Sequence, residues 1–139
     1  MNEPHVTISL DGNGRVYRPG ETLSGEYRLG GFRAEEVKAV EVSVLWYTVG
    51  KGDEDLAVHD FWRSSPDESD CHPLHRPHRF STRLPNSPWS YNGVIVKIRW
   101  CVRVRVFQTH GKDVVGDLVF RLGDLSAARP VAAGIRNEG

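Results

Sequence analysis

The sequence predicts an all-β protein folded as a two-sheet antiparallel β-sandwich, and three observations carry this prediction. About seven segments alternate apolar and polar residues, the pattern of half-buried strands, and Gly- or Pro-containing turns separate them. No window shows sustained helical spacing, although residues 33–38 could form a single turn. The 139 residues fit one domain with its own core. Strands that each bury one face need a second sheet to cover it, so a sandwich is expected.

The N-terminal part contains two predicted strands bounded by turns. Residues 6–10 alternate apolar and polar side chains, and the Asp-Gly-Asn-Gly turn at 11–14 then predicts a hairpin or loop tip. A second turn is predicted at Pro19-Gly20, because proline fixes φ and glycine adopts backbone conformations that residues with a Cβ avoid. Residues 23–29 follow with Leu, Gly, Tyr and Leu at every second position, which predicts the second strand.

The central part combines one long strand with shorter ones. Residues 37–49 place Val and Trp side chains on one face and predict a central strand. Residues 56–62 alternate more loosely and predict a short strand. Residues 64–77 lack periodicity and contain three prolines, so they predict a surface loop. A further strand is expected at 79–84, followed by an ordered crossing loop at 85–93.

The longest predicted strand covers residues 94–107. One face carries Val94, Val96, Ile98, Trp100, Val102, Val104 and Val106, and the other carries Ile95, Lys97, Arg99, Cys101, Arg103, Arg105 and Phe107. The apolar face is expected in the core, together with Trp46 of the central strand. Residues 114–122 form the last predicted strand. One sandwich domain is therefore expected over residues 1–123, with a loosely ordered C-terminal tail at 124–139.

Two turn segments carry a family resemblance. Residues 17–25 read Tyr-Arg-Pro-Gly-Glu-Thr-Leu-Ser-Gly, and residues 84–93 read Leu-Pro-Asn-Ser-Pro-Trp-Ser-Tyr-Asn-Gly before the longest strand. In the order and spacing of these segments the chain resembles the arrestin-like domain, whose relatives include signalling arrestins, the arrestin-like subunit of retromer and bacterial sporulation-control proteins. The resemblance implies an immunoglobulin-like sandwich. It also implies a non-enzymatic interaction or scaffold module that binds a partner protein through a sheet edge, loops or a sheet face.

Charge is distributed unevenly although the formal net charge is zero. Residues 53–70 contain seven acids and one base, whereas residues 71–112 contain eight bases and no acid. Zero net charge argues against a general polyanion binder. Two interpretations stay open for the asymmetry. The two segments could neutralise each other across paired strands, at about 0.2–1 kcal/mol per pair, or the basic segment could form a recognition surface.

Strand alternation places Lys97, Arg99, Arg103 and Arg105 on one sheet face, in a row about 25 Å long at roughly 3.3 Å per residue. Such a row could bind an acidic or phosphorylated segment of a partner protein, because Arg side chains hold carboxylate and phosphate oxygens in a fork. The row could instead pair with acids of neighbouring strands. A nucleic-acid-binding module is a further alternative, although the sequence shows no nucleic-acid-binding motif.

Loop aromatics and sheet edges offer further contact surfaces. Trp89 and Tyr91 lie in the crossing loop, where they could be exposed aromatic anchors, or Trp89 could plug one end of the sandwich. A lone sandwich also exposes sheet edges, which can pair with a partner strand or with a second copy. A homodimer through sheet edges is therefore an additional expectation.

Cys71, His72, His75 and His78 fall within eight positions and offer ligands of the kind that zinc prefers. The prolines among them and the lack of two separate ligand pairs favour a solvated loop instead. A metal-binding regulatory domain is the alternative function that this loop would support. No cofactor is expected.

No catalytic constellation is recognisable in the sequence, which contains neither a strained-turn nucleophile motif nor a phosphate-binding glycine loop. Cys101 lies between Arg99 and Arg103, so its thiol could have a lowered pKa. Alternatively it is a small apolar residue within a sheet. We therefore expect that the protein is not an enzyme.

A cytoplasmic location is expected from three further features. The chain has no apolar run of about 20 residues that could cross a bilayer, and residues 1–5 lack the features of a signal peptide. The two cysteines form no CxxC unit, which favours free thiols in a reducing compartment.

Overall fold

The structure, a computed structural model, describes residues 3–12, 16–52, 54–65 and 76–123. Its elements in chain order are β1 (His5–Leu10), β2 (Val16–Tyr17), β3 (Thr22–Gly30), the 3₁₀ turn η1 (Ala34–Glu36), β4 (Val37–Gly50), β5 (Leu56–Ser64), β6 (His78–Arg83), β7 (Tyr91–Asn92), β8 (Val96–Gln108) and β9 (Val114–Leu122). Most of the predicted loop at 64–77 and all of the predicted tail at 124–139 lie outside the described residues.

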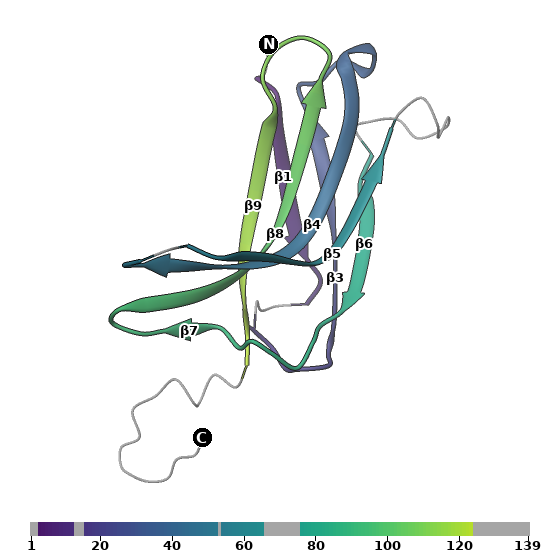
Figure 1. The fold of residues 1–139 in the computed structure, drawn as a ribbon. Coiled ribbons are helices and arrows are strands. Elements are labelled where there is room, and N and C mark those ends of the chain that lie inside the picture. The colour runs from purple at the N-terminus through teal and green to yellow at the C-terminus, as the bar shows by residue number, and fades with distance from the viewer. Residues whose placement is uncertain (1–2, 13–15, 53, 66–75, 124–139) are drawn as a thin grey trace, which may run out of the picture.

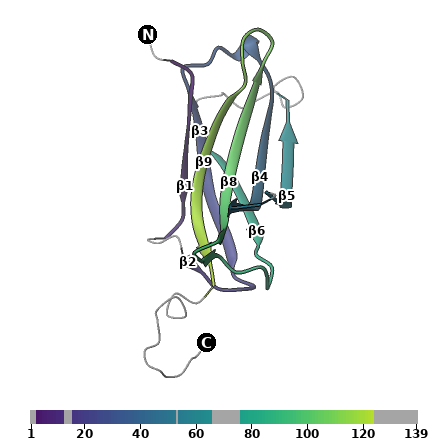
Figure 2. The same cartoon turned by 60° about the vertical axis from the view of Figure 1, so that its left-hand side comes forward.

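The strands form two sheets that face each other, which confirms the predicted sandwich (Figure 1, Figure 2). The smaller sheet has the order β1-β3-β6. The larger sheet has the order β2-β9-β8-β4-β5, and the short β7 also pairs with β8. Every pairing is antiparallel except that of β2 with β9, where Val16 and Tyr17 run parallel to Arg121 and Leu122. Within the described residues, β1 pairs with β3 in the smaller sheet, whereas β2, the next strand in the chain, belongs to the larger sheet.

The core lies between the inner faces of the two sheets and follows from strand alternation. The wholly buried apolar side chains include Leu23, Val44, Trp100, Val102, Val104 and Val106. From Trp100 to Val106 the alternation of β8 thus buries the face that the sequence predicted to be inside, whereas Val96 and Ile98 of that face are only partly buried. Trp46 packs against this core from β4 but is only partly buried. Burial of such side chains contributes about 1.5–3 kcal/mol each, so this layer is the main source of stability.

The two flanks of the sandwich are closed differently. On one flank β1 packs directly against β9, and a Cβ placed on Gly116 would lie only 3.0 Å from the Cβ of Val6. Glycine is needed here because the strands approach so closely. On the other flank, side chains of β5 reach the end of β6. His59 Nε2 donates to the carbonyl oxygen of Arg83 over 2.7 Å, and Thr82 Oγ1 donates to Asp60 Oδ2 over 2.7 Å.

Towards the start of β6, away from these two hydrogen bonds, a groove of about 560 Å³ lies between β5 and β6. Its apolar walls include Val40, Val42, Trp62 and Phe80, and the rings of Trp62 and Phe80 are 6.4 Å apart. The larger sheet has more strands than the smaller one, so the inner side of β5 extends beyond the cover that β6 provides.

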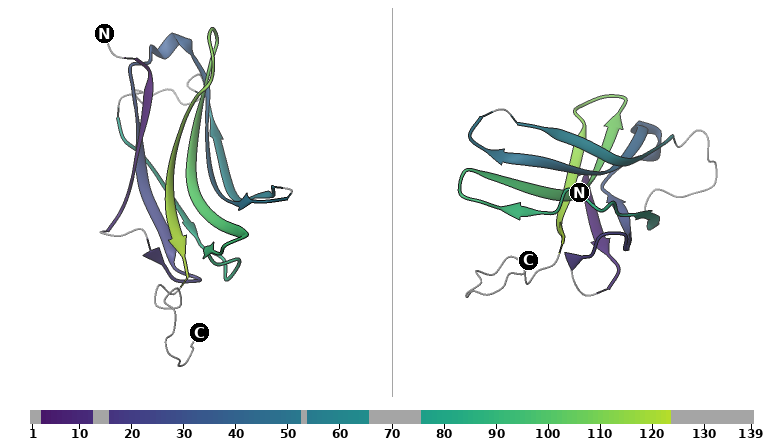
Figure 3. Two further views of the ribbon diagram at one scale, coloured as in Figure 1. Left: turned by 90° about the vertical axis from the view of Figure 1, so that its left-hand side faces the viewer. Right: turned by 60° about the horizontal axis from the view of Figure 1, so that its bottom comes forward.

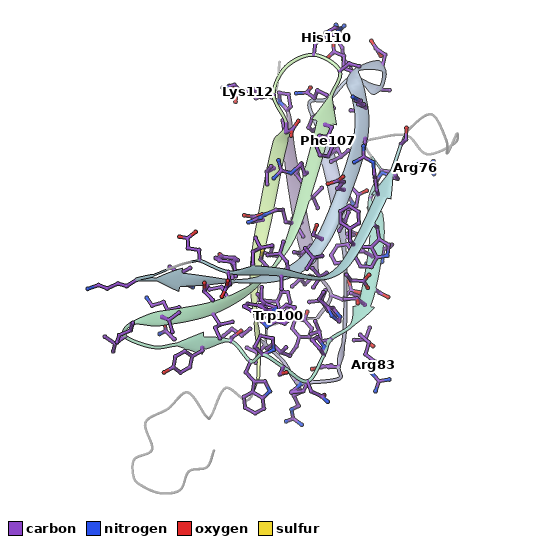
Figure 4. All side chains as sticks on the ribbon, viewed as in Figure 1. Arg76, Arg83, Trp100, Phe107, His110 and Lys112 are labelled. Atoms are coloured by element: carbon purple, nitrogen blue, oxygen red, sulfur yellow. The ribbon has the colours of Figure 1, made fainter. Side chains whose placement is uncertain are left out.

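The β4–β5 and β7–β8 hairpins extend beyond the body in one direction, and their ends (residues 47–52, 54–56 and 91–99) are called the arm (Figure 3). Trp100 lies where the arm joins the body, and Phe107 lies towards the far end of β8 (Figure 4). At the tip, the Lys51 N–H donates to the Ile95 carbonyl oxygen over 3.3 Å, which ties the two hairpins together.

Two local predictions, for residues 94–95 and for His78, differ from the structure, and the structure explains a third. Val94 and Ile95, predicted to be in the longest strand, form the exposed turn before it, with 102% and 68% of their surface accessible. The chain reverses there, because the Gly93 N–H donates to the Val96 carbonyl oxygen over 3.1 Å. The loose alternation of β5 comes from an irregularity opposite Val44, where His59 is the extra residue. His78 opens β6 and is not a loop residue.

A candidate interaction site beside β8

The predicted basic row lies on the outer face of the larger sheet, and its two halves differ in their partners. Arg103 Nε donates to Asp117 Oδ1 over 2.8 Å, and Arg105 Nη1 lies 3.4 Å from Asp113 Oδ2. The hydrogen bond to Asp117 raises the pKa of the Arg103 guanidinium. Both acids come from β9 or the turn before it, so the interpretation that acids of neighbouring strands neutralise the row holds for this half. Exposed pairs of this kind contribute about 0–1 kcal/mol each.

The other half of the row has no such compensation. Lys97 and Arg99 form no ion pair with any acid in the described part of the chain. The register explains this, because Lys97 lies opposite Val49 and Arg99 opposite Tyr47 on β4. Directly opposed residues of an antiparallel pair point to the same face, so neither cation has an acid beside it.

The strand pairing of β8 leaves a gap next to Arg99. β9 pairs with β8 as far as the Trp100–Phe120 position, and β7 takes over from the Ile98–Tyr91 position. Between these pairings the sheet contains a hollow, here called the notch, of about 490 Å³. The notch is lined by Ser90, Tyr91, Asn92, Lys97, Ile98, Arg99, Val119, Phe120 and Arg121.

Arg121 adds a third cation to the notch. It lies on β9, and it too forms no ion pair with an acid in the described ranges. Arg121 was not among the predicted site residues. The alternation of residues 114–122 could have placed it on the outer face with Asp117, but only the β8–β9 register, in which Phe120 lies opposite Trp100, brings it next to Arg99.

Hydrogen bonds to the backbone hold the rim of the notch in place. The Ser90 N–H donates to the Leu122 carbonyl oxygen over 2.7 Å, and the Leu122 N–H donates to Ser90 Oγ over 2.9 Å. Trp100 Nε1, from the buried side of β8, donates to the Pro88 carbonyl oxygen over 2.8 Å. The segment before β7 is thus fixed both to β9 and to the core. A site with such a fixed rim loses less conformational entropy when it binds a ligand.

The two predicted loop aromatics lie in different settings. Tyr91 lines the notch, and 56% of its surface is exposed. Trp89 is also partly exposed, but its Nε1 donates to the Asn86 carbonyl oxygen over 3.0 Å and its ring packs against Gly123. Tyr91 therefore belongs to the notch, whereas Trp89 covers the end of β9.

The predicted metal ligands can be followed only in part. Cys71, His72 and His75 lie outside the described residues. His78 stacks on Tyr27 with a centroid distance of 5.0 Å and an interplanar angle of 15°. Across residues 3–12, 16–52, 54–65 and 76–123, no group of three or more His, Cys, Asp or Glu residues could hold a metal ion.

Cys101 is not an activated thiol. Its side chain is wholly buried, and this burial raises its pKa to about 12, with Asp117 adding to the increase and Arg103 opposing it. The lowered pKa that its basic neighbours suggested is therefore wrong. The alternative interpretation, a small apolar residue within the sheet, agrees with this environment.

No protein-family model and no curated protein matches the chain. Among solved structures, it is similar to the sporulation control protein Spo0M from Bacillus subtilis, with a TM-score of 0.60 and 14% sequence identity. The match covers 89% of this chain and 51% of the Spo0M chain, so this chain spans about half the length of that protein. No helix in the described residues is long and apolar enough to cross a membrane. The structural similarity establishes the fold, which is an arrestin-like β-sandwich.

Proposed function

We propose that this chain is a non-enzymatic interaction module that binds an acidic or phosphorylated segment of a partner protein at the notch. The observation that carries the proposal is the set of three cations, Lys97, Arg99 and Arg121, that line one hollow without acid partners in the described residues. Exposed cations that are not neutralised within a domain are available to an anionic ligand. The arrestin-like fold supports a module of this kind.

The chemistry of the notch suits anion recognition. Guanidinium groups bind carboxylate or phosphate in a bidentate manner, and the Lys97 ammonium adds a compact charge. Asn92 and Tyr91 at the rim can donate further hydrogen bonds. The Ser90 hydroxyl already accepts the Leu122 N–H, and the lining contains no carboxylate or imidazole that could act as its general base. Binding is therefore a better match to this lining than covalent catalysis.

Fluorescence anisotropy with three labelled peptides tests the proposal. The peptides share one Gly- and Ser-rich sequence and contain three glutamates, three phosphoserines or three serines. We expect the first two to bind and the third not to bind. Replacing Lys97, Arg99 and Arg121 together by Ser should weaken binding about 100-fold, because each exposed ion pair contributes up to about 1 kcal/mol and tenfold corresponds to about 1.4 kcal/mol.

The matched control is the double variant Arg103→Ser/Arg105→Ser, which removes cations from the same face but leaves the notch intact. Its affinity for the anionic peptides should stay within about threefold of the native value, since compensated charges contribute little. If this control loses as much affinity as the triple variant, or if neither anionic peptide binds the native protein, the notch is not the site.

A further inference from the structure

The outer face of the larger sheet also carries an apolar surface that the notch does not explain. Cross-strand register places Val58, Leu45, Cys101 and Val119 in one row across β5, β4, β8 and β9. Leu45 and Cys101 are buried in the middle of this row, whereas Val58 and Val119 are exposed at its ends. This row, here called the stripe, is apolar throughout, but its accessible parts are its two ends, on the face that also carries the cations.

The β5 end of the stripe is the more exposed. Leu56 and Phe61 lie in the neighbouring rows, opposite Tyr47 and Ser43 of β4, and so point to the same face as Val58. The exposed fractions of Leu56, Val58 and Phe61 are 54%, 50% and 48%. Three large apolar side chains exposed together on an edge strand are unusual, because soluble proteins normally place charged residues there. We call these three residues the β5 patch.

The β5 patch and the notch lie at a distance that one short segment can span. Leu56 shares a row with Arg99 through Tyr47, so it lies two strands from Arg99 and three strands from Arg121, about 10–14 Å at roughly 4.8 Å per strand. Val58 and Phe61 lie further along β5, in the rows of Cys101 and Arg103. An extended chain covers this distance in about three to four residues at roughly 3.3 Å per residue. A single peptide can therefore contact both surfaces.

Building on the proposed function, we propose that the partner segment is amphipathic: its acidic or phosphorylated residues occupy the notch while large apolar residues, about four positions away, bind the β5 patch. Charge complementarity assigns the two ends of the segment. Near the notch the sheet offers cations without acid partners, whereas Glu54 and Asp55 come directly before Leu56 of the patch and would repel an acidic end. Arg63, beside Phe61, is already paired with Glu41. The segment therefore runs across the strands in one direction only.

Two other occupants of the β5 patch fit the observations less well. A second copy pairing edge to edge would meet the irregularity at His59 and the Phe61 N–H, which already donates to Asp60 Oδ1 over 2.9 Å. Irregularities of this kind protect edges from pairing. An anionic lipid surface would be attracted to the notch cations, but Glu54 and Asp55 beside Leu56 would oppose its approach to the patch.

The test compares two labelled peptides in anisotropy. The first has three glutamates, a Gly-Ser-Gly spacer and Phe-Ser-Leu, and the second has Ser in place of Phe and Leu. We expect the native protein to bind the first peptide about tenfold more tightly, since buried apolar anchors dominate such interfaces. The double variant Val58→Ser/Phe61→Ser should lose this tenfold advantage and still bind the second peptide with native affinity. The control Val115→Ser removes another exposed apolar residue, which lies opposite Arg105 on the same face, and should bind both peptides like the native protein.

The possible outcomes distinguish failure of the amphipathic segment from failure of the proposed function. If the second peptide binds through the notch cations but the first binds no better, the amphipathic segment is overturned and the proposed function stands. If neither peptide binds, both proposals fail. An equal loss in Val115→Ser, or a concentration-dependent dimer in sedimentation that disappears in Val58→Ser/Phe61→Ser, would also overturn the amphipathic segment. Thermal unfolding of each variant confirms that it is folded.

Discussion

The two halves of the outer face of β8 have the same residue types at the same spacing but differ in their chemistry. Arg103 and Arg105 face acids from β9 and the turn before it, whereas Lys97 and Arg99 face Val49 and Tyr47. A basic residue on a strand is therefore compensated or available according to its cross-strand neighbour, which its own sequence context does not reveal. The uncompensated half lies beside a hollow in the sheet.

The largest expected effect comes from breaking the connection between the two halves. Trp100 is wholly buried where they meet, and its indole N–H is bonded to the Pro88 carbonyl oxygen. Trp100→Ala should lower the free energy of unfolding by about 3–5 kcal/mol, because it leaves both a cavity and an unpaired carbonyl. Urea denaturation measures the change.

Trp100→Phe serves as the control for this prediction, because it keeps most of the apolar volume and loses only the hydrogen bond. Its destabilisation should be clearly smaller than that of Trp100→Ala. Equal losses would mean that the bond to Pro88, and not packing in the core, joins the notch rim to the body.

Much of this comparison could be predicted from the alternation along single strands. The alternation of residues 96–106 placed Trp100, Val102, Val104 and Val106 inside, as observed, and the basic row on the opposite face, whose exposure the sequence left open. The pairing register could not be predicted, because it depends on contacts between segments far apart in the chain. Arg121 was therefore not predicted as a site residue, and the sequence did not identify which acids pair with Arg103.

The position of the arm tip was also beyond sequence reasoning. Val94 and Ile95 extend the apolar alternation of the strand that follows, and nothing local distinguishes them from it. They are exposed because β7 pairs back onto β8 and forces the chain to reverse at Gly93. Similarly, the burial of Cys101 on an outer face depends on its apolar neighbours Leu45 and Val119 across the sheet.

An acid placed opposite the available half should convert it into the compensated kind. Val49 lies opposite Lys97 and is exposed, so Val49→Glu brings a carboxylate beside this cation without a change in the core. Affinity for the triglutamate peptide should fall about fivefold, since a cross-strand pair is worth up to roughly 1 kcal/mol. Val49→Gln, which has the same size but no charge, should bind like the native protein. A similar loss in both variants would show that shape and not charge governs the site.

Removing an acid from the compensated half should lower the free energy of unfolding only slightly. Asp117→Asn leaves Arg103 without its carboxylate, and because the pair is partly exposed the free energy of unfolding should fall by no more than about 1 kcal/mol. The freed guanidinium should increase binding of the triglutamate peptide. Asp113→Asn, which releases Arg105 from a longer contact of 3.4 Å, should change both quantities less. A larger effect at Asp113 would contradict the ranking by distance.

The smallest expected effect concerns Arg79 of the smaller sheet. Its partner is the carboxylate of Asp11, so this pair depends on pH under acid conditions. Asp11 accepts hydrogen bonds from Arg79 and from Ser24 Oγ, and these bonds lower its pKa from 3.8 to about 2. Because the pKa is lower in the folded protein, the stabilisation is fully present above the unfolded value and is lost as pH falls through the folded value. Asp11→Asn should therefore be less stable than the native protein near pH 5, and the difference should shrink as pH approaches about 2. Urea denaturation at both pH values measures it, with Glu35→Gln, an exposed acid of η1, as the control. A constant difference across this window would show that Asp11 acts through the geometry of its turn, and not through its charge.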